Sequence, residues 1–409
     1  MAKQRRIPER NELRAYNHAA AGHEGTLCDV DGELFIKPCH QPEIDFYAQA
    51  NRHYPEFADI MPLFMGNLML SDANNLQIDD AVAGVVSDNG VTGDSAKQIA
   101  NTVAEQVARA SAPAQPQEEK PWVPSGGKAV KTDRAVVLEN AGHGFKRPNI
   151  LDVKLGVRLW ADDAAPAKKN KFKETAKHST HSNLAFRIAG MRVFRGSDNE
   201  ADWDDEEYVI YDRDYGRFDM KLENIQQGFA NFIFNESAGI DKDLGQAVCA
   251  AFAQELSRIQ EIVQAHETRI YSASLLFLFE GDGDALREAV NKNNEVVTMV
   301  EEKHANRATL RMDSGIVMGD DDNMIEAAVL GDMDDDDDDD DDDDEMANVP
   351  PIFALKLIDF AHAEFVPGQG PDEYMSMGIE KLHEIFDKLS KHDVEDVHIT
   401  GYDLDESHF

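Results

Sequence analysis

The sequence predicts an α+β fold, because strand and helix patterns are mixed along it without a regular βαβ repeat. Short β-rich runs such as residues 352–360 occur among amphipathic helical patterns such as residues 244–264. Apolar residues make up 42% of the 409 residues, which is enough to bury a sizeable core. We therefore expect a mixed architecture rather than a doubly wound parallel sheet.

The amino-terminal half of the chain predicts a strand, a helix and a long insertion. Residues 26–40 alternate in a strand-like way, and two prolines then precede a helical pattern over residues 43–52. Residues 71–125 are rich in small and polar residues with weak periodicity, which is typical of an insertion, although residues 96–110 could form a helix. A short apolar run at residues 136–138 predicts a second strand.

The carboxyl-terminal half predicts strands and helices around a second insertion. Residues 281–349 form that insertion, with a helix near residues 285–308 ahead of an acidic block. Residues 244–264 carry apolar side chains at three- and four-residue steps, so one face of this helix is expected to pack on a core. The other predicted segments are strands at 148–156, 270–279 and 352–360, a helix that begins at 166 and a closing helix at 372–391.

Much of the formal net charge of −39 is local. Asp334 to Asp344 is an unbroken aspartate run, and a like-charge block of this length repels itself and stays disordered. We expect a solvated tether there. A contact surface for basic transcription or chromatin proteins is the alternative.

Apolar runs and cysteine usage indicate the compartment. The apolar runs are far shorter than the ~20 residues of a membrane-spanning helix, and the basic amino terminus has no apolar signal core behind it. Cys28, Cys39 and Cys249 are widely spaced, which predicts reduced thiols rather than a disulfide framework or a zinc ribbon. We therefore expect a soluble, intracellular protein without a transmembrane segment.

The predicted strand at residues 148–156 carries an acid and a base two residues apart in an apolar run. Because side chains alternate between the faces of a strand, Asp152 and Lys154 share one face with Ile150, while the leucines and the valine between them point into a core. One face of this strand is therefore expected to meet a ligand.

Two further pairs of residues suit a metal-bound nucleotide. Asp359 ends the strand at 352–360, where a carboxylate can hold a magnesium ion that shares its shell with phosphates, and His362 is a candidate for proton transfer. Lys37 ends the first strand and Glu43 opens the helix behind it, an order in which an acid can orient a lysine onto ATP phosphates. The alternatives are a turn or helix cap for Asp359 and an exposed lysine with a first-turn glutamate.

A basic stripe follows Pro166, which can open a helix. The lysines of this stripe are Lys168, Lys169, Lys171, Lys173 and Lys177. Several ammonium groups at helical spacing suit a multiply phosphorylated ligand, and Arg187 and Arg192 lie downstream. A nuclear-localisation or nucleic-acid patch is the alternative, but few aromatic residues are interleaved, so we expect no direct nucleic-acid binding.

These residues together resemble the inositol polyphosphate kinase family. The motif Pro148-x-x-x-Asp152-x-Lys154-x-Gly156 is similar to the P-x-x-x-D-x-K-x-G signature of that family. Similar segments occur in the family's order at Lys37 with residues 43–47, and at residues 138–140, 272–276 and 358–362. The resemblance covers about residues 26–70, 130–280 and 350–391, and leaves both insertions outside it. Ala273 departs from it, since the family usually has a serine there.

The resemblance implies a two-lobed, kinase-like and ATP-grasp-related architecture with ATP between the lobes. Residues 1–25 would form a tail and residues 26–138 an N-lobe that contains the insertion at 71–125. Residues 139–409 would form a C-lobe. That lobe would include an inositol-phosphate-binding helical segment at 162–192 and a disordered acidic insertion at 281–349.

The resemblance also implies roles for the candidate residues. Those that bind ATP would be Lys37, Glu43, Glu139, Ala141, Asp152 and Asp359. Those that bind the inositol phosphate would be Lys154, Lys168, Lys171 and Arg192. The catalytic residues would be Lys154, Asp359 and His362, with Asp359 as the ligand of Mg²⁺.

Within the family, the residues at the motif positions resemble those of the multikinase branch. That branch implies ATP- and Mg²⁺-dependent phosphorylation of inositol tris- and tetrakisphosphates towards the pentakisphosphate, in nucleus and cytoplasm, with phosphoinositide headgroups as further candidate acceptors. The alternatives are a hexakisphosphate kinase that makes pyrophosphates, and a scaffold that binds transcription or chromatin proteins through the aspartate run.

Overall fold

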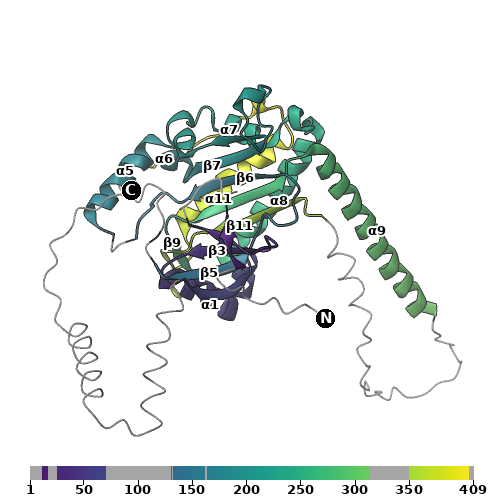
Figure 1. The fold of residues 1–409 in the computed structure, drawn as a ribbon, viewed down its shortest axis with the longest axis horizontal. Helices are drawn as coiled ribbons and strands as arrows, with labels where there is room; N and C mark the ends of the chain where they lie inside the picture. The colour runs from purple at the N-terminus through teal and green to yellow at the C-terminus, as the bar shows by residue number, and fades with distance from the viewer. Residues whose placement is uncertain are drawn as a thin grey trace, which may run out of the picture.

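The structure, a computed structural model, describes residues 12–16, 25–70, 130, 132–161, 164–313 and 350–404. Its strands form two five-stranded sheets and a two-stranded ribbon, with helices packed on the large sheets (Figure 1). The predicted α+β class is confirmed. The insertion at residues 71–125 and the aspartate run lie outside the described residues, so their character stays a prediction.

The first sheet is antiparallel and has the strand order β1-β2-β3-β5-β4. Its strands are β1 (Arg14–Ala15), β2 (Leu27–Cys28), β3 (Leu34–Pro38), β4 (Phe64–Met69) and β5 (Arg134–Glu139). Arg14 pairs with Cys28 and Ala15 with Leu27, so the expectation of a tail over residues 1–25 is wrong for β1. A two-residue edge strand held by backbone pairing has too few side chains to show a periodicity.

Helices α1 (Gln41–His53) and α2 (Pro55–Asp59) follow β3, where the helix at 43–52 was predicted. Pro42 lies in the first turn of α1, where a missing N–H leaves no hydrogen bond unmade. The buried face of α1 places Phe46 4.8 Å, between ring centroids, from both Phe360 and Phe365. Helix α1 therefore joins the first sheet to the segment that follows the last long strand.

The second sheet is also antiparallel, with the order β11-β10-β6-β7-β8. Its strands are β6 (Pro148–Leu155), β7 (Phe186–Phe194), β8 (Tyr208–Tyr211), β10 (Ser274–Glu280) and β11 (Phe353–Ile358). Leu151 and Val153 are fully buried in a core shared with α7 (Ile225–Ile233), α8 (Lys242–Ala265) and α11 (Glu373–Leu389). The opposite face, which we call the polar face, carries Asp152 and Lys154, as the alternation predicts.

The predicted strand at 270–279 is broken in the structure. Residues Thr268–Ile270 form β9, which pairs only with β12 (Ala363–Phe365) in the separate ribbon, and β10 begins at Ser274. Ser272, between them, has a left-handed backbone with φ of +63°. The β-rich composition of this run therefore hid a turn that hydrophobicity does not reveal.

The remaining helices surround the second sheet or project from it. They are α5 (Pro166–His178), α6 (His181–Leu184), α9 (Gly283–Asp313) and the short η2 (Glu200–Asp202), η3 (Tyr215–Asp219), η4 (Glu236–Ala238) and η6 (Val394–Asp396). Helix α9 extends away from the body of the molecule (Figure 1) and contains the helix predicted near residues 285–308, so the insertion at 281–349 is helical over its first part. Among the described residues, no helix combines the length and apolarity needed to cross a bilayer.

Candidate active site

Four charged side chains meet in one group, which we call the lysine–aspartate cluster: Lys37 from β3, Glu43 from α1, Lys154 from β6 and Asp359 just after β11. Lys37 Nζ lies 2.6 Å from Glu43 Oε1 and 2.7 Å from Asp359 Oδ1. Lys154 Nζ donates to the other carboxylate oxygen of Asp359 and, at 3.1 Å, to the carbonyl oxygen of Ser272. Residues predicted separately from three parts of the chain thus lie in direct contact.

Two groups that accept hydrogen bonds from Lys154 belong to residues with a left-handed backbone. Asp359 has φ of +71° and Ser272 has φ of +63°. Residues other than glycine adopt this region rarely, at a cost of about 1–3 kcal/mol, and such strain concentrates at functional sites. The backbone on both sides of Lys154 is therefore shaped to hold its ammonium group.

The opposite charges of the cluster stabilise one another. Burial would raise the pKa of Asp359, but the ammonium groups of Lys154 and Lys37 outweigh it and hold that pKa well below its usual range. Burial would lower the pKa of Lys37, but the carboxylates of Asp359 and Glu43 raise it well above its ordinary value. Lys37 and Asp359 are therefore both charged at neutral pH.

Asp152 lies two residues before Lys154 on the polar face and is 4% exposed. Its Oδ1 has no hydrogen-bond partner among the described residues. Burial raises the pKa of Asp152, and the charge of Lys154 offsets only part of that effect. A buried carboxylate oxygen without a donor is free to accept a hydrogen bond from a ligand hydroxyl.

An arginine pair, Arg187 and Arg217, lies beside this cluster. Arg187 stands directly opposite Lys154 in the β6–β7 ladder and is 6% exposed. The Nε atoms of both arginines are buried without a partner in the described structure. Burial and the positive charge of Arg217 lower the pKa of Arg187 to about 10. Arg217 is only partly buried, and its guanidinium lies 3.6 Å from Asp214 Oδ1. Two neighbouring guanidinium groups that repel each other form a place for an anion.

The position of Arg187 depends on a β-bulge. Asp152 pairs with Gly190 but Val153 pairs with Ile188, so Ala189 is an extra residue in β7. Without it, side-chain alternation would put Arg187 and Arg192 on opposite faces of the sheet. With it, both arginines lie on the polar face.

Arg217 is the functional candidate that the sequence did not suggest. It lies in η3, a single π-helical turn with no amphipathic pattern. A Cβ on the preceding Gly216 would lie 1.9 Å from the carbonyl oxygen of Ile188, so only glycine lets η3 pack against β7. That close approach is what brings Arg217 beside Arg187.

Helix α5 brings the basic stripe towards the same place. Lys168 Nζ lies 3.3 Å from Nε2 of His362, so a predicted substrate-binding residue contacts a predicted catalytic residue. Because an ammonium group only donates, Nε2 of His362 is the acceptor in this contact. Lys171 is exposed on the same helix, and Lys173 lies over the ring of Trp160.

Arg192 lies elsewhere on the polar face. It stands opposite Ile150, four residues from Lys154, which is about 13 Å along the strand at about 3.3 Å per residue. Its guanidinium is ion-paired with Glu206 and stacks 3.6 Å from the centroid of the Tyr208 ring. The structure therefore separates Arg192 from the cluster that Lys154 belongs to, whereas Arg187 lies directly opposite Lys154.

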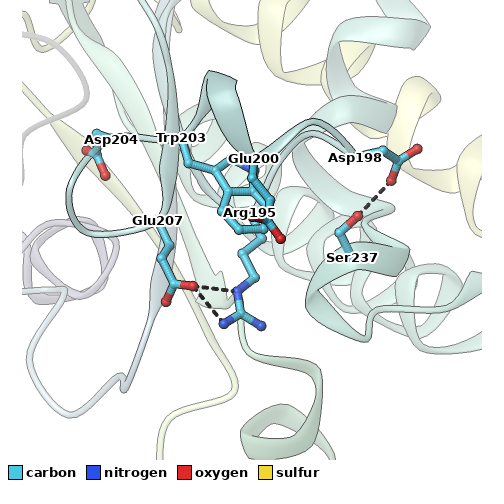
Figure 2. Close-up of a pocket in the computed structure, with 7 residues that line it drawn as sticks. All are labelled: Arg195, Asp198, Glu200, Trp203, Asp204, Glu207 and Ser237. Carbon is cyan, nitrogen blue, oxygen red and sulfur yellow. Dashed lines mark hydrogen bonds and ion pairs between the residues drawn. The ribbon is translucent and has the colours of Figure 1, made fainter.

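A cavity of about 550 Å³ lies beyond the end of β7. Figure 2 shows its lining, which consists of Arg195, Asp198, Glu200, Trp203, Asp204, Glu207 and Ser237. Arg195 donates two hydrogen bonds to Glu207 Oε1, at 3.1 and 2.8 Å, and Ser237 donates to Asp198 at 2.7 Å. With four acids and one paired arginine, this cavity does not suit a polyphosphate.

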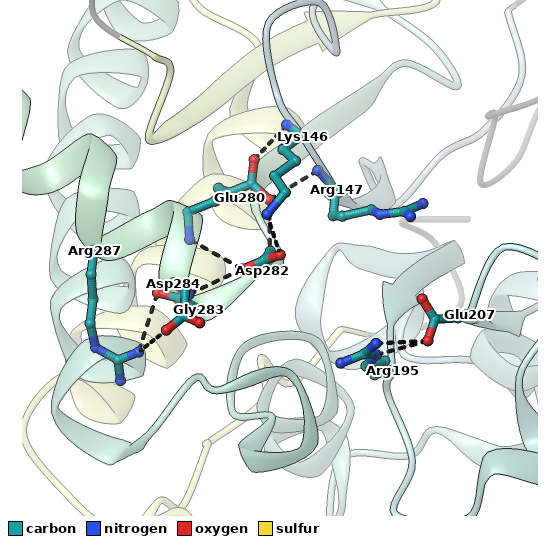
Figure 3. Close-up of polar contacts among 10 residues, drawn as sticks. Lys146, Arg147, Arg195, Glu207, Glu280, Asp282, Gly283, Asp284 and Arg287 are labelled. Carbon is teal, nitrogen blue, oxygen red and sulfur yellow. Dashed lines mark hydrogen bonds and ion pairs between the residues drawn. The ribbon is translucent and has the colours of Figure 1, made fainter.

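The connection between the sheets, residues 140–147, is fixed at both ends. The Glu280 carboxylate accepts hydrogen bonds from the backbone N–H groups of Lys146, at 2.6 Å, and Arg147, at 3.0 Å (Figure 3). At the other end, Asn140 donates its backbone N–H to Glu33 and its side-chain amide to Gly32, both at 2.8 Å. We call this connection the hinge.

The two residues predicted to meet adenine are Glu139, the last residue of β5, and Ala141 in the hinge. The N–H of Glu139 donates to the carbonyl oxygen of Leu63 at 3.0 Å, and its carboxylate lies 3.6 Å from Lys356 Nζ. The N–H of Ala141 has no acceptor within the described part of the chain. A backbone donor is therefore available at the position where adenine is expected.

The residues of the cluster suit a metal ion that a nucleotide brings. Among the described residues, no three His, Cys, Asp or Glu side chains are placed to hold a metal by themselves. Asp359 offers hard carboxylate oxygens between two ammonium groups, and Mg²⁺ is usually held by one or two carboxylates together with phosphates and water. The cluster therefore offers two lysines for the phosphates and one carboxylate for the ion, which are the groups that a nucleotide with its Mg²⁺ needs.

Comparisons with known proteins place these residues in a family context. A family model described as inositol polyphosphate kinase matches residues 135–387. The inositol polyphosphate multikinase of Saccharomyces cerevisiae is 29% identical over 411 aligned residues, which cover 93% of this chain and 99% of the yeast protein. Human inositol hexakisphosphate kinase 1 is 24% identical over 65% of this chain and 54% of its own length.

Solved structures were compared as well. A crystal structure of the S. cerevisiae inositol phosphate multikinase in complex with ADP and Mn²⁺ covers 87% of this chain and 98% of its own, with 21% identity and a TM-score of 0.49.

Proposed function

This chain belongs to the inositol polyphosphate kinase family, and we propose that within this family it is an ATP- and Mg²⁺-dependent multikinase. It is a phosphotransferase that acts on inositol phosphates. We assign it inositol tris- and tetrakisphosphates as substrates, with the pentakisphosphate as the product. The arrangement that carries the proposal is the lysine–aspartate cluster with the arginine pair beside it.

The charge distribution supports a polyphosphate substrate. The chain as a whole carries a formal net charge of −39, yet Lys154 and Arg187 lie side by side on the polar face, with Arg217 near Arg187. Helix α5 adds Lys168 from the side of His362. Several fixed cations on an otherwise acidic protein attract a multiply phosphorylated ring and each donates charge-assisted hydrogen bonds to it.

We assign the nucleotide to the hinge side of the cluster. The free N–H of Ala141 would meet the base, the buried Oδ1 of Asp152 would accept from the ribose, and Lys37 would meet the phosphates. Asp359 would hold the Mg²⁺. When bound, this ion would neutralise negative charge on the phosphates of the nucleotide.

The chain's own residues would act mainly by positioning and by electrostatics, as phosphoryl transfer requires. Lys154 would bridge the two substrates, because it lies between Asp359 on the nucleotide side and Arg187 on the other. A bond would form from the ring oxygen to the γ-phosphorus as the bond to ADP breaks. His362 would take the hydroxyl proton once Lys168 has turned from Nε2 to a substrate phosphate.

The test is a product analysis. The purified protein is incubated with ATP, Mg²⁺ and an inositol trisphosphate, and the products are separated by anion-exchange chromatography. We expect tetrakis- and pentakisphosphates from the wild type and none from Asp359→Ala. A lack of phosphorylated product, or full activity in Asp359→Ala, contradicts the proposal.

A hexakisphosphate kinase is the second candidate, because kinases of that kind are among the relatives. The multikinase is preferred because the yeast multikinase aligns over nearly its whole length, whereas the human hexakisphosphate kinase aligns over about half of its own. The same assay with inositol hexakisphosphate separates the two. Pyrophosphate products from hexakisphosphate, without turnover of trisphosphate, would favour the second candidate.

A further inference from the structure

Tyr16, just after the edge strand β1, reaches towards the hinge. Its backbone N–H donates to the carbonyl oxygen of Thr26 at 3.0 Å, which continues the pairing of β1 with β2 by one residue. Its ring meets the edge of Phe35 with centroids 5.0 Å apart and planes at 82°. The main chain and the ring together hold this tyrosine against the first sheet.

The hydroxyl end of Tyr16 lies at the hinge and next to the second sheet. A Cβ on Gly142 would lie 3.6 Å from the Tyr16 hydroxyl oxygen and 3.7 Å from Leu278 Cδ2. Burial raises the pKa of Tyr16 to about 12, and the nearby charge of Arg192 on β7 opposes that rise. Tyr16 therefore lies close to both sheets and to the connection between them.

The surfaces around Tyr16 are the ones that carry the site. Phe35 lies two residues before Lys37 on β3, so both side chains are on the same face of the first sheet. Leu278 pairs with Ile150, two residues before Asp152, so it lies on the polar face of the second sheet. Ala141, whose N–H is available for a base, is adjacent to Gly142.

We propose that Tyr16 forms one wall of the pocket for the nucleotide base, so that the amino-terminal strand is part of the ATP site. The ring would pack against the base, and β1 would keep it there because the strand is hydrogen-bonded to β2. Arg192 on the second sheet is fixed by Glu206 and Tyr208. The inference rests on the proposed function, since it takes the nucleotide to lie at the hinge.

The test compares nucleotide and inositol phosphate parameters in full-length variants. Tyr16→Ala removes the wall, Tyr16→Phe keeps the ring, and Arg14→Ala on the same strand is the control because its side chain is exposed. ATP binding is measured by calorimetry with Mg²⁺ and without inositol phosphate, and KM values are measured for ATP and for an inositol trisphosphate. Tyr16→Leu, which keeps apolar bulk, replaces Tyr16→Ala if circular dichroism shows that the alanine variant is unfolded.

We expect Tyr16→Ala to raise the Kd and the KM for ATP by about five- to twentyfold, because the variant loses an aromatic contact and the area that it buries. The KM for the inositol phosphate should stay within about twofold, and Tyr16→Phe and Arg14→Ala should resemble the wild type. Unchanged ATP binding in Tyr16→Ala overturns the inference. So does tighter binding, which would mean that Tyr16 obstructs the site, or a full loss in Tyr16→Phe.

The two failures are distinguishable because ATP binding is measured without the second substrate. A wild type that binds ATP in a Tyr16-dependent way but phosphorylates no inositol phosphate supports the inference and contradicts the proposed function. If the wild type is an active kinase and Tyr16→Ala binds ATP as tightly as the wild type does, the proposed function is supported and the inference about Tyr16 is contradicted.

Discussion

Replacement of Glu43 by glutamine tests how much the buried acid contributes through Lys37. The Glu43 side chain is 3% exposed, and its Oε1 accepts from Lys37 Nζ at 2.6 Å and from the backbone N–H of Phe360 at 3.3 Å. Glutamine has the same shape and keeps an acceptor oxygen, so both hydrogen bonds can persist. Only the charge on the acceptor is lost, because Asp359 still keeps Lys37 protonated.

The expected loss follows from the change of acceptor. A hydrogen bond to a charged group contributes about 1.5–3 kcal/mol and a neutral one about 0.5–1.5 kcal/mol, a difference of about 1–1.5 kcal/mol. If this difference appears in the transition state, kcat/KM for ATP falls by roughly five- to thirteenfold. Glu43→Ala should in addition leave the buried N–H of Phe360 unpaired and remove one of the two carboxylates that Lys37 contacts, which costs about 1–3 kcal/mol of stability and lowers Tm by several degrees.

Steady-state kinetics and thermal melting of Glu43→Gln, Glu43→Ala and Asp45→Asn separate the contributions. Asp45 is exposed on the same helix and contacts only Gln41 among its described partners, so Asp45→Asn is the matched control. A value of kcat/KM in Glu43→Gln within twofold of the wild type refutes the reasoning. An equal loss in Asp45→Asn does so as well, because the effect would then come from helix charge rather than from Lys37.

Three further outcomes are expected. The pKa of Asp152 is raised in the folded protein, so this residue contributes stability below the usual carboxyl pKa of 3.8, and that contribution is lost as the pH rises through the folded-state pKa. Asp152→Asn should therefore raise Tm at pH 7.5. The same substitution should weaken ATP binding measured by calorimetry. Arg187→Met should raise the KM for inositol trisphosphate about tenfold or more and leave the KM for ATP unchanged, as product assays would show; equal changes in both would speak against an anion site. Gly378→Ala would place a Cβ 2.6 Å from the carbonyl oxygen of Ala185, so Tm should fall by an amount that corresponds to about 1–3 kcal/mol, whereas Ser376→Ala on the same helix should not lower it.

The sequence predicted those helices and strands in which buried side chains recur at regular intervals. Helices α1, α8 and α11 and strands β6 and β11 were predicted to within a few residues, because each buries one face and so carries a period in its side chains. The single strand predicted over residues 26–40 is divided in the structure into β2 and β3, which pair with each other. The break at Ser272 and the strand β1 carry no such period. They are fixed by single backbone conformations and by main-chain pairing, which hydropathy does not record.

The same distinction applies to the site. Asp152, Lys154 and Asp359 could be proposed because each interrupts an apolar strand with a charge. Arg187 was mentioned only as a neighbour of the basic stripe, and Arg192 was preferred to it. The choice depends on Ala189, one inserted residue that changes which face every later side chain in β7 occupies.

Asp359 acts as an internal counter-ion for two lysines from different sheets. A polyphosphate that enters the site therefore meets ammonium groups that already have a negative partner. Binding is then an exchange of one anion for another rather than the introduction of a new charge into a partly buried site. The ionic part of the affinity is only the difference between the two sets of contacts. For the same reason, the site without ligand can keep two lysines together without losing its structure.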